Sequence, residues 1–89
     1  MRSVQIVLRG HVQGVFLRAT VARYAQTHGI LGWVRNEPDG TVSIRAQSST
    51  KSIDDLLAWL RTQPTAGHIE QVGVTEVEPS RAFVGFSIL

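Results

Sequence analysis

The stretch that decides the fold is Leu8-Arg9-Gly10-His11-Val12-Gln13-Gly14-Val15-Phe16-Leu17-Arg18. Apolar residues at alternate positions lead into it, which predicts a strand, and apolar residues at three- and four-residue spacing follow it, which predicts a helix over residues 17–28. A strand, a glycine loop and a helix start together favour anion binding, because the first helical N–H groups lack partners and the helix dipole is positive there. We therefore expect this loop to hold a phosphate, with Arg18 supplying the charge.

Composition limits the kinds of protein that this chain can be. Its 89 residues and 43% hydrophobic content predict one packed globular domain over residues 1–89. The absence of cysteine excludes disulfides, a thiolate nucleophile and cysteine metal ligands. The first residues do not resemble a signal peptide, and no run approaches the ~20 apolar residues of a membrane span. We expect a cytoplasmic protein that does not bind membranes.

The net charge of +2 is small, but the charges are unevenly distributed. Residues 1–36 contain five arginines and no acidic residue, whereas residues 37–89 contain all seven acidic residues. The positive field therefore surrounds the glycine loop, which suits a small anion. The alternative is that these arginines are solvated surface residues, and only for Arg18 does the loop favour a ligand.

The rest of the chain supplies a second helix and four more strands. Strands are predicted over 31–36, 41–47 and 69–78, with a last strand through Phe86, a turn at 37–40 and a bulge or bend at Gly73. The second helix is predicted to start at a Ser52 cap and to end before Pro64. Trp33 and Trp59 are interpreted as core or core-edge residues.

This order predicts an α+β fold, a ferredoxin-like sandwich with the order β-α-β-β-α-β(β). Each helix carries one apolar stripe, so we expect both helices to pack on one face of a mostly antiparallel sheet. The other face is expected to be largely polar, through Gln5, Arg9, Thr41, Ser43 and Arg45.

Two segments resemble the signatures of a known family. Gly10-His11-Val12-Gln13-Gly14-Val15-Phe16-Leu17-Arg18 is similar to the G-x-V-Q-G-V-x-[FY]-R signature of acylphosphatases, and Gly32-Trp33-Val34-Arg35-Asn36-Glu37-Pro38-Asp39-Gly40 is similar to their second signature, G-W-V-R-N-x-x-D-G. Taken alone, Asn36 reads as an ordinary turn residue, because asparagine hydrogen-bonds its own turn. The resemblance gives it another role.

The family resemblance implies hydrolysis of acyl phosphates to a carboxylate and inorganic phosphate, without metal or other cofactor. It implies that Arg18 binds the phosphate together with the loop amides of Gln13, Gly14, Val15, Phe16, Leu17 and Arg18, and that Asn36 holds the attacking water. The expected partner is a small-molecule acyl phosphate, with no nucleic acid and no membrane, and the chain is expected to be a monomer.

Some residues depart from this pattern or read as structural. Leu17 replaces the usual Phe or Tyr before the arginine, which is expected to loosen the packing behind the loop and lower activity. His11, His28 and His68 show no metal-ligand spacing. Two alternatives stay open: a ferredoxin-like module that binds RNA or protein through its open sheet face, and a carbamoyl-phosphate-binding relative.

Overall fold

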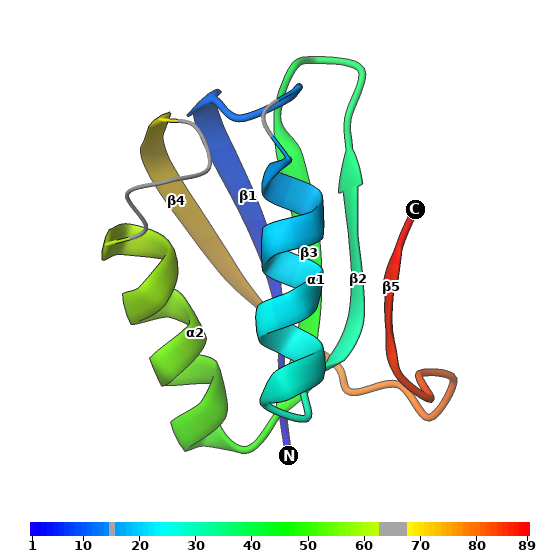
Figure 1. Ribbon diagram of the computed structural model, residues 1–89. Coiled ribbons are helices and arrows are strands. Elements are labelled where there is room, and N and C mark those ends of the chain that lie inside the picture. The colour runs from blue at the N-terminus through cyan, green and yellow to red at the C-terminus, as the bar shows by residue number, and fades with distance from the viewer. Residues whose placement is uncertain (15, 63–67) are drawn as a thin grey trace.

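A computed structural model describes residues 1–14, 16–62 and 68–89 of the chain. Its elements, in chain order, are β1 (Arg2–His11), α1 (Leu17–Thr27), β2 (Leu31–Asn36), β3 (Val42–Ser48), α2 (Thr50–Thr62), β4 (His68–Val77) and β5 (Phe86–Ile88) (Figure 1). This is the predicted order. Pro64, which was expected to close the second helix, lies outside the described residues.

The strands form one sheet in the order β4-β1-β3-β2-β5. The pairs β1–β3, β1–β4 and β2–β3 are antiparallel, and β5 joins β2 in parallel. Both helices cover the same face of this sheet (Figure 1). The predicted ferredoxin-like α+β fold with a mostly antiparallel sheet is therefore confirmed.

The core lies between this sheet face and the two helices. Alternate residues of β1 are fully buried there, and the apolar stripes of both helices face them. The buried members of these stripes are Val4, Ile6 and Leu8 of β1, Leu17, Val21 and Ala25 of α1, and Ile53, Leu56 and Leu60 of α2. Because burying each such side chain contributes about 1.5–3 kcal/mol, these stripes decide which faces meet.

A bulge in β4 changes the phase of that strand, but it does not lie at Gly73 as predicted. Gly73 pairs in register with Val7, whereas the register shifts after Arg9, where Glu70 is the extra residue. The extra residue lets Ile69 and Val72 both pack against the core although they are three positions apart. Opposite the bulge, Gly10 has a φ of 126°, and a Cβ there would collide with the carbonyl oxygen of His68.

The outer face of the sheet is partly covered by the segment between β4 and β5. Ser43 and Gln47 are buried on this face. Residues 78–85, which lead from β4 to β5, contact it at Arg45 and Gln47. The Gln47 Nε2 donates to the Ser80 carbonyl at 2.8 Å, and the Ser80 N–H donates to Gln47 Oε1 at 2.7 Å. Trp33, expected in or beside the core, pairs with Arg45 on this outer face, with the Arg35 guanidinium 4.6 Å from its ring centroid.

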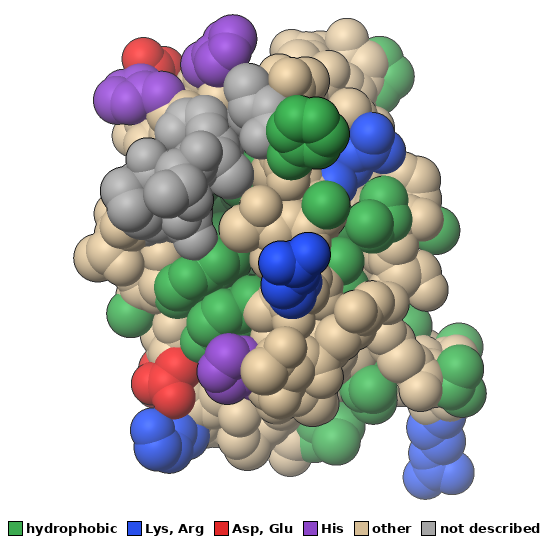
Figure 2. Space-filling view, viewed as in Figure 1, with side chains coloured by type: hydrophobic (Ala, Val, Ile, Leu, Met, Phe, Trp, Pro, Cys, Tyr) green, Lys and Arg blue, Asp and Glu red, His purple; other side chains and the backbone are tan. Residues whose placement is uncertain are grey.

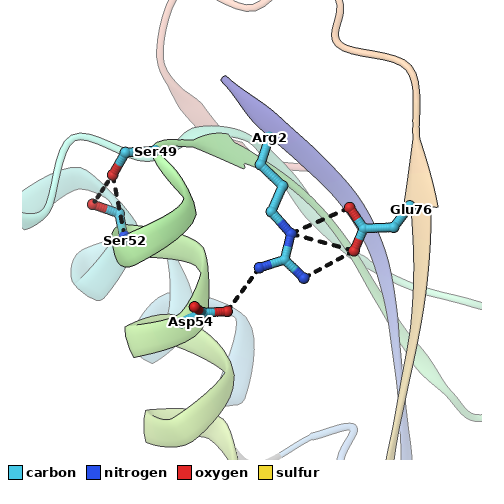
Figure 3. Close-up of polar contacts among 5 residues, drawn as sticks. All are labelled: Arg2, Ser49, Ser52, Asp54 and Glu76. Atoms are coloured by element: carbon cyan, nitrogen blue, oxygen red, sulfur yellow. Dashed lines mark hydrogen bonds and ion pairs between the residues drawn. The ribbon is translucent and has the colours of Figure 1, made fainter.

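The second helix begins three residues earlier than predicted. The Ser49 Oγ accepts a hydrogen bond from the Ser52 backbone N–H at 3.2 Å, and α2 starts at Thr50 (Figure 3). Ser49 is therefore the N-cap, and the prediction of Ser52 was wrong. Asp54 consequently lies beyond the first turn, where it accepts a 2.7 Å bond from Arg2 Nη1.

Candidate active site

A pocket of about 290 Å³ opens where the β1–α1 loop meets the end of β2 and the last strand. Its lining residues are Val12, Gly14, Phe16, Leu17, Arg18, Ala19, Asn36 and Ile88. The structure thus brings the predicted pair, Arg18 and Asn36, to one pocket although they come from different elements. In Figure 2 hydrophobic side chains gather beside a basic side chain at the end of the molecule where this loop lies.

The loop backbone takes two unusual turns on its way into α1. Gly14 has a φ of 75°, and Phe16 adopts the left-handed conformation with φ 61° and ψ 16°. Phe16 is the N-cap of α1, and no side chain of the described residues caps this helix start with a hydrogen bond. The first-turn N–H groups are thus left without a side-chain acceptor, as an anion site requires. Val15 lies outside the described residues.

Arg18 lies in the first turn of α1, as predicted, and its side chain is anchored at one point. Its Nη1 donates to the main-chain oxygen of Leu89 at 3.0 Å, and this is the one side-chain hydrogen bond of Arg18 within the described part of the chain. A guanidinium carries five N–H donors, so most of them remain available for an anion. Arg35 differs, because its Nε donates to Glu37 Oε2 at 2.9 Å and lowers the pKa of that carboxyl.

Asn36 ends β2 and lines the pocket, and it carries a buried acceptor without a partner among the described residues. Its Oδ1 is buried, and it is the one buried side-chain N or O atom within residues 1–14, 16–62 and 68–89 that has no hydrogen-bond partner. Buried polar groups are nearly always paired, since an unpaired one costs about 1–3 kcal/mol. A pocket-lining residue that keeps an acceptor unpaired is therefore a candidate to bind a donor from solvent or from a ligand.

Gln13 has a second role that was not foreseen. Its side-chain Nε2 donates to the carbonyl oxygens of Glu37 and Thr41, each at 2.8 Å. These two carbonyls flank the turn that follows Asn36, so Gln13 fixes the glycine loop to the segment that carries Asn36. The only signal in the sequence was an amide residue within the loop, and nothing there identified its acceptors.

The turn between β2 and β3 is also held by its own side chains. The Asp39 Oδ1 accepts hydrogen bonds from Thr41 Oγ1 at 2.6 Å and from Thr41 N–H at 3.0 Å, which lower the pKa of the Asp39 carboxyl. Asp39 thus orders the turn rather than serving as a proton acceptor in the pocket. Within the described residues, no group of three or more His, Asp or Glu side chains lies close enough to hold a metal ion.

Leu17 is buried and packs in the core while also lining the pocket. A branched aliphatic side chain thus occupies the position before Arg18, where the signature that this loop resembles has Phe or Tyr. Its predicted cost in activity stays a prediction. No helix of the described residues is long and apolar enough to cross a membrane.

Comparison with known proteins gives consistent matches over the whole chain. The acylphosphatase family profile matches residues 4–88. An acylphosphatase of Methylococcus capsulatus is 40% identical over 89 residues, which cover 100% of this chain and 97% of that protein. The crystal structure of an acylphosphatase from Bacillus subtilis superposes with a TM-score of 0.93 at 28% identity, covering 100% of this chain and 99% of that one.

A larger protein contains a similar fold. A crystal structure of full-length HypF in a phosphate- and nucleotide-bound form matches 99% of this chain with a TM-score of 0.90 and 29% identity. The match covers only 12% of the HypF chain.

Proposed function

This chain belongs to the acylphosphatase family, and from that premise we propose how its pocket hydrolyses acyl phosphates. The chain is a hydrolase that acts on a small acyl phosphate. We propose that Arg18 and the loop amides of residues 13–18 bind the phosphoryl group, and that Asn36 holds the attacking water. The unpaired, buried Oδ1 of Asn36 in the pocket that Arg18 lines is the observation that carries this proposal.

The proposed binding of the phosphoryl group uses charge and geometry together. The guanidinium of Arg18 offers paired donors that match phosphoryl oxygens. The N–H groups at the start of α1 add donors and the positive end of the helix dipole. Donors fixed in place before the substrate arrives stabilise the charge on the phosphoryl oxygens in the transition state without reorganisation.

Asn36 is proposed to orient water and not to act as a base. The water donates a hydrogen bond to the Asn36 Oδ1. This hydrogen bond holds the water oxygen against phosphorus, on the side opposite the acyl oxygen. A bond forms between the water oxygen and phosphorus while the bond from phosphorus to the acyl oxygen breaks, and its electron pair leaves with the carboxylate. The water proton passes to a phosphoryl oxygen, since an amide oxygen is too weak a base to keep it.

The leaving group needs no acid to protonate it. Carboxylates have a pKa of about 4, so they depart as stable anions at neutral pH. Positioning and electrostatics are then sufficient for the reaction, and neither a histidine nor a metal ion is required for this step. Activity is accordingly expected to survive treatment with EDTA, and its loss on chelation would overturn this mechanism.

The direct test is phosphate release from benzoyl phosphate, with a phosphomonoester such as p-nitrophenyl phosphate as the control. We expect turnover of the anhydride and no turnover of the ester, because an alkoxide or phenoxide is a poorer leaving group than a carboxylate. Binding of carbamoyl phosphate without turnover of either compound would instead support the carbamoyl-phosphate-binding alternative.

We also propose that residues 1–89 form a single domain that works as a monomer in the cytoplasm. One contiguous cluster of buried side chains joins the sheet to both helices, which supports a single folding unit. The chain contains no cysteine, so its stability is independent of an oxidising compartment. Sedimentation equilibrium at micromolar concentration tests the monomer, which predicts a mass of 9.8 kDa.

A further inference from the structure

Phe16 is an aromatic residue that the fold itself does not use. Its side chain is 88% exposed, although it occupies the centre of the loop between Gly14 and α1. Its left-handed backbone conformation, with φ 61°, is unfavourable for a bulky residue. Residues in such conformations cluster at functional sites, so the exposed ring at this position is a candidate to contact a ligand.

The ring stands at the mouth of the pocket that Arg18 and Asn36 line. Ile88 lines the same pocket from the last strand and is 49% exposed, so two large apolar side chains border it. The pocket therefore has a polar part, made by Arg18, Asn36 and the loop backbone, and an apolar part.

An acyl phosphate has the same two parts. If the phosphoryl group lies against Arg18, the acyl group must extend from it, and the apolar residues at the rim are the surface that it meets. Contact with an aromatic ring and a branched aliphatic side chain favours acyl groups that are aromatic or carbon-rich, because their burial removes apolar surface from water. Small polar acyl groups such as carbamoyl gain little there.

We propose that Phe16 and Ile88 form an acyl-binding rim that makes this chain selective for acyl phosphates with aromatic or larger aliphatic acyl groups. This inference rests on the proposed function, since it needs the phosphoryl group at Arg18. Phe16 is thus assigned as a specificity-determining residue, and its side chain has no part in binding the phosphoryl group.

The test compares kcat/KM for benzoyl phosphate with kcat/KM for acetyl phosphate in the full chain. Phe16→Gly removes the ring and leaves a residue that readily adopts a positive φ, so the loop keeps its conformation. We expect the ratio of kcat/KM for benzoyl phosphate to kcat/KM for acetyl phosphate to fall roughly three- to tenfold in this variant.

Three further variants distinguish the effect of the Phe16 ring on substrate preference from effects on the loop conformation. Phe16→Tyr keeps an aromatic ring and should retain the benzoyl preference, while Ile88→Ala should reduce it in the same direction as Phe16→Gly and by a smaller factor. Val84→Ala is the matched control, because Val84 is 98% exposed and does not line the pocket. It should leave both substrates unaffected.

The measurements distinguish a failure of the proposed function from a failure of the acyl-binding rim alone. A parent chain that hydrolyses neither substrate would refute the proposed function. A parent chain that hydrolyses both, with a Phe16→Gly variant in which the ratio of the two kcat/KM values is unchanged, would refute the acyl-binding rim alone. Equal loss for both substrates in Phe16→Gly would show that Phe16 acts on the loop conformation, and would also refute the rim.

Discussion

The molecule places an arginine near each of its two ends, and the two arginines are held in opposite ways. Arg2, at the start of β1, donates from Nη1 to Asp54 and from Nε and Nη2 to Glu76, so all three of its nitrogens face carboxylates (Figure 3). Arg18, at the other end, has a single bond to the main-chain oxygen of Leu89 among the described residues. One guanidinium is neutralised within the fold, and the other is kept available.

The same contrast holds for uncharged groups. Near Arg2, the Ser49 Oγ accepts from the Ser52 N–H and bonds the Ser52 hydroxyl at 3.1 Å. Near Arg18, the Asn36 Oδ1 is buried and has no partner within the described residues. Polar groups that stabilise a fold are satisfied by protein atoms, whereas groups that bind a ligand are left for the ligand to satisfy. The comparison thus points to the end with Arg18 and Asn36 as the candidate functional end, without reference to the relatives of this chain.

The largest expected effect comes from removing the available guanidinium. Arg18→Ala should lower kcat/KM for benzoyl phosphate by roughly 10³-fold or more and abolish competitive inhibition by phosphate, because the fixed positive charge of the pocket is lost. Steady-state kinetics of Arg18→Ala and Arg18→Lys test this. Lysine keeps the charge without the paired donors, so it should recover part of the phosphate affinity. Kinetics of Arg18→Ala like those of the parent chain would contradict the assignment.

Asn36→Ala should lower kcat by about 10²-fold and leave the inhibition constant for phosphate little changed, because Asn36 is proposed to hold water and not substrate. The unpaired Oδ1 adds a second expectation, since its removal takes away a buried acceptor without a partner. The melting temperature of Asn36→Ala should therefore be equal to that of the parent chain or higher. Loss of phosphate inhibition together with kcat would contradict this division of roles.

Gln13 lies at the candidate functional end, yet its side-chain NH2 group is hydrogen-bonded to protein atoms, unlike the Asn36 Oδ1. Gln13→Ala removes both hydrogen bonds to the carbonyls of Glu37 and Thr41, so the two halves of the site are no longer tied together. We expect kcat to fall by roughly tenfold and the free energy of unfolding to fall by ~1–3 kcal/mol. Urea unfolding and kinetics of the same preparation measure both. An unaltered kcat in a destabilised variant would limit Gln13 to a purely structural role.

The smallest effect on activity is expected from Arg2, whose guanidinium is paired with the carboxylates of Asp54 and Glu76. Arg2 lowers the pKa of the Glu76 carboxyl, so the pair contributes stability above the ordinary glutamate pKa of about 4.3 and loses it as the pH falls through the lower folded value. Arg2→Ala should therefore lower the melting temperature slightly at pH 7, and the difference should shrink below about pH 4. Its kcat should equal that of the parent chain. Thermal unfolding between pH 3 and 7 checks the sign, and a difference that grew in acid would contradict it.

Much of the fold was predictable because it depends on local patterns. Alternation in β1 and helical spacing in α1 and α2 fix which side of each element is apolar, and those sides can be buried together in few ways. Errors arose where a position had two acceptable local solutions. Ser49 and Ser52 both suit a helix cap, and Gly73 is as natural a bulge residue as Glu70, so only the register of the sheet and the packing of α2 choose between them.

The residues of the candidate site likewise fall into those that local sequence patterns indicated and those that they did not. Arg18 was predictable from its place after a glycine loop, whereas Asn36 read as a turn residue until the two signatures were considered together. The roles of the Gln13 side chain, the Leu89 main-chain oxygen and Ile88 had no signal in the sequence. The contact between Arg18 and Leu89 spans 71 positions, and no local pattern describes such a contact.

The sequence by itself determined the elements, their buried faces and the position of the glycine loop proposed to bind an anion, because each of these follows from the order of neighbouring residues and the conformations they allow. The tertiary structure decided which polar groups stay unpaired. That property depends on which partners the fold brings within hydrogen-bond distance of each group. For the Asn36 Oδ1 the described part of the fold brings none, and for Arg2 it brings two carboxylates from distant elements.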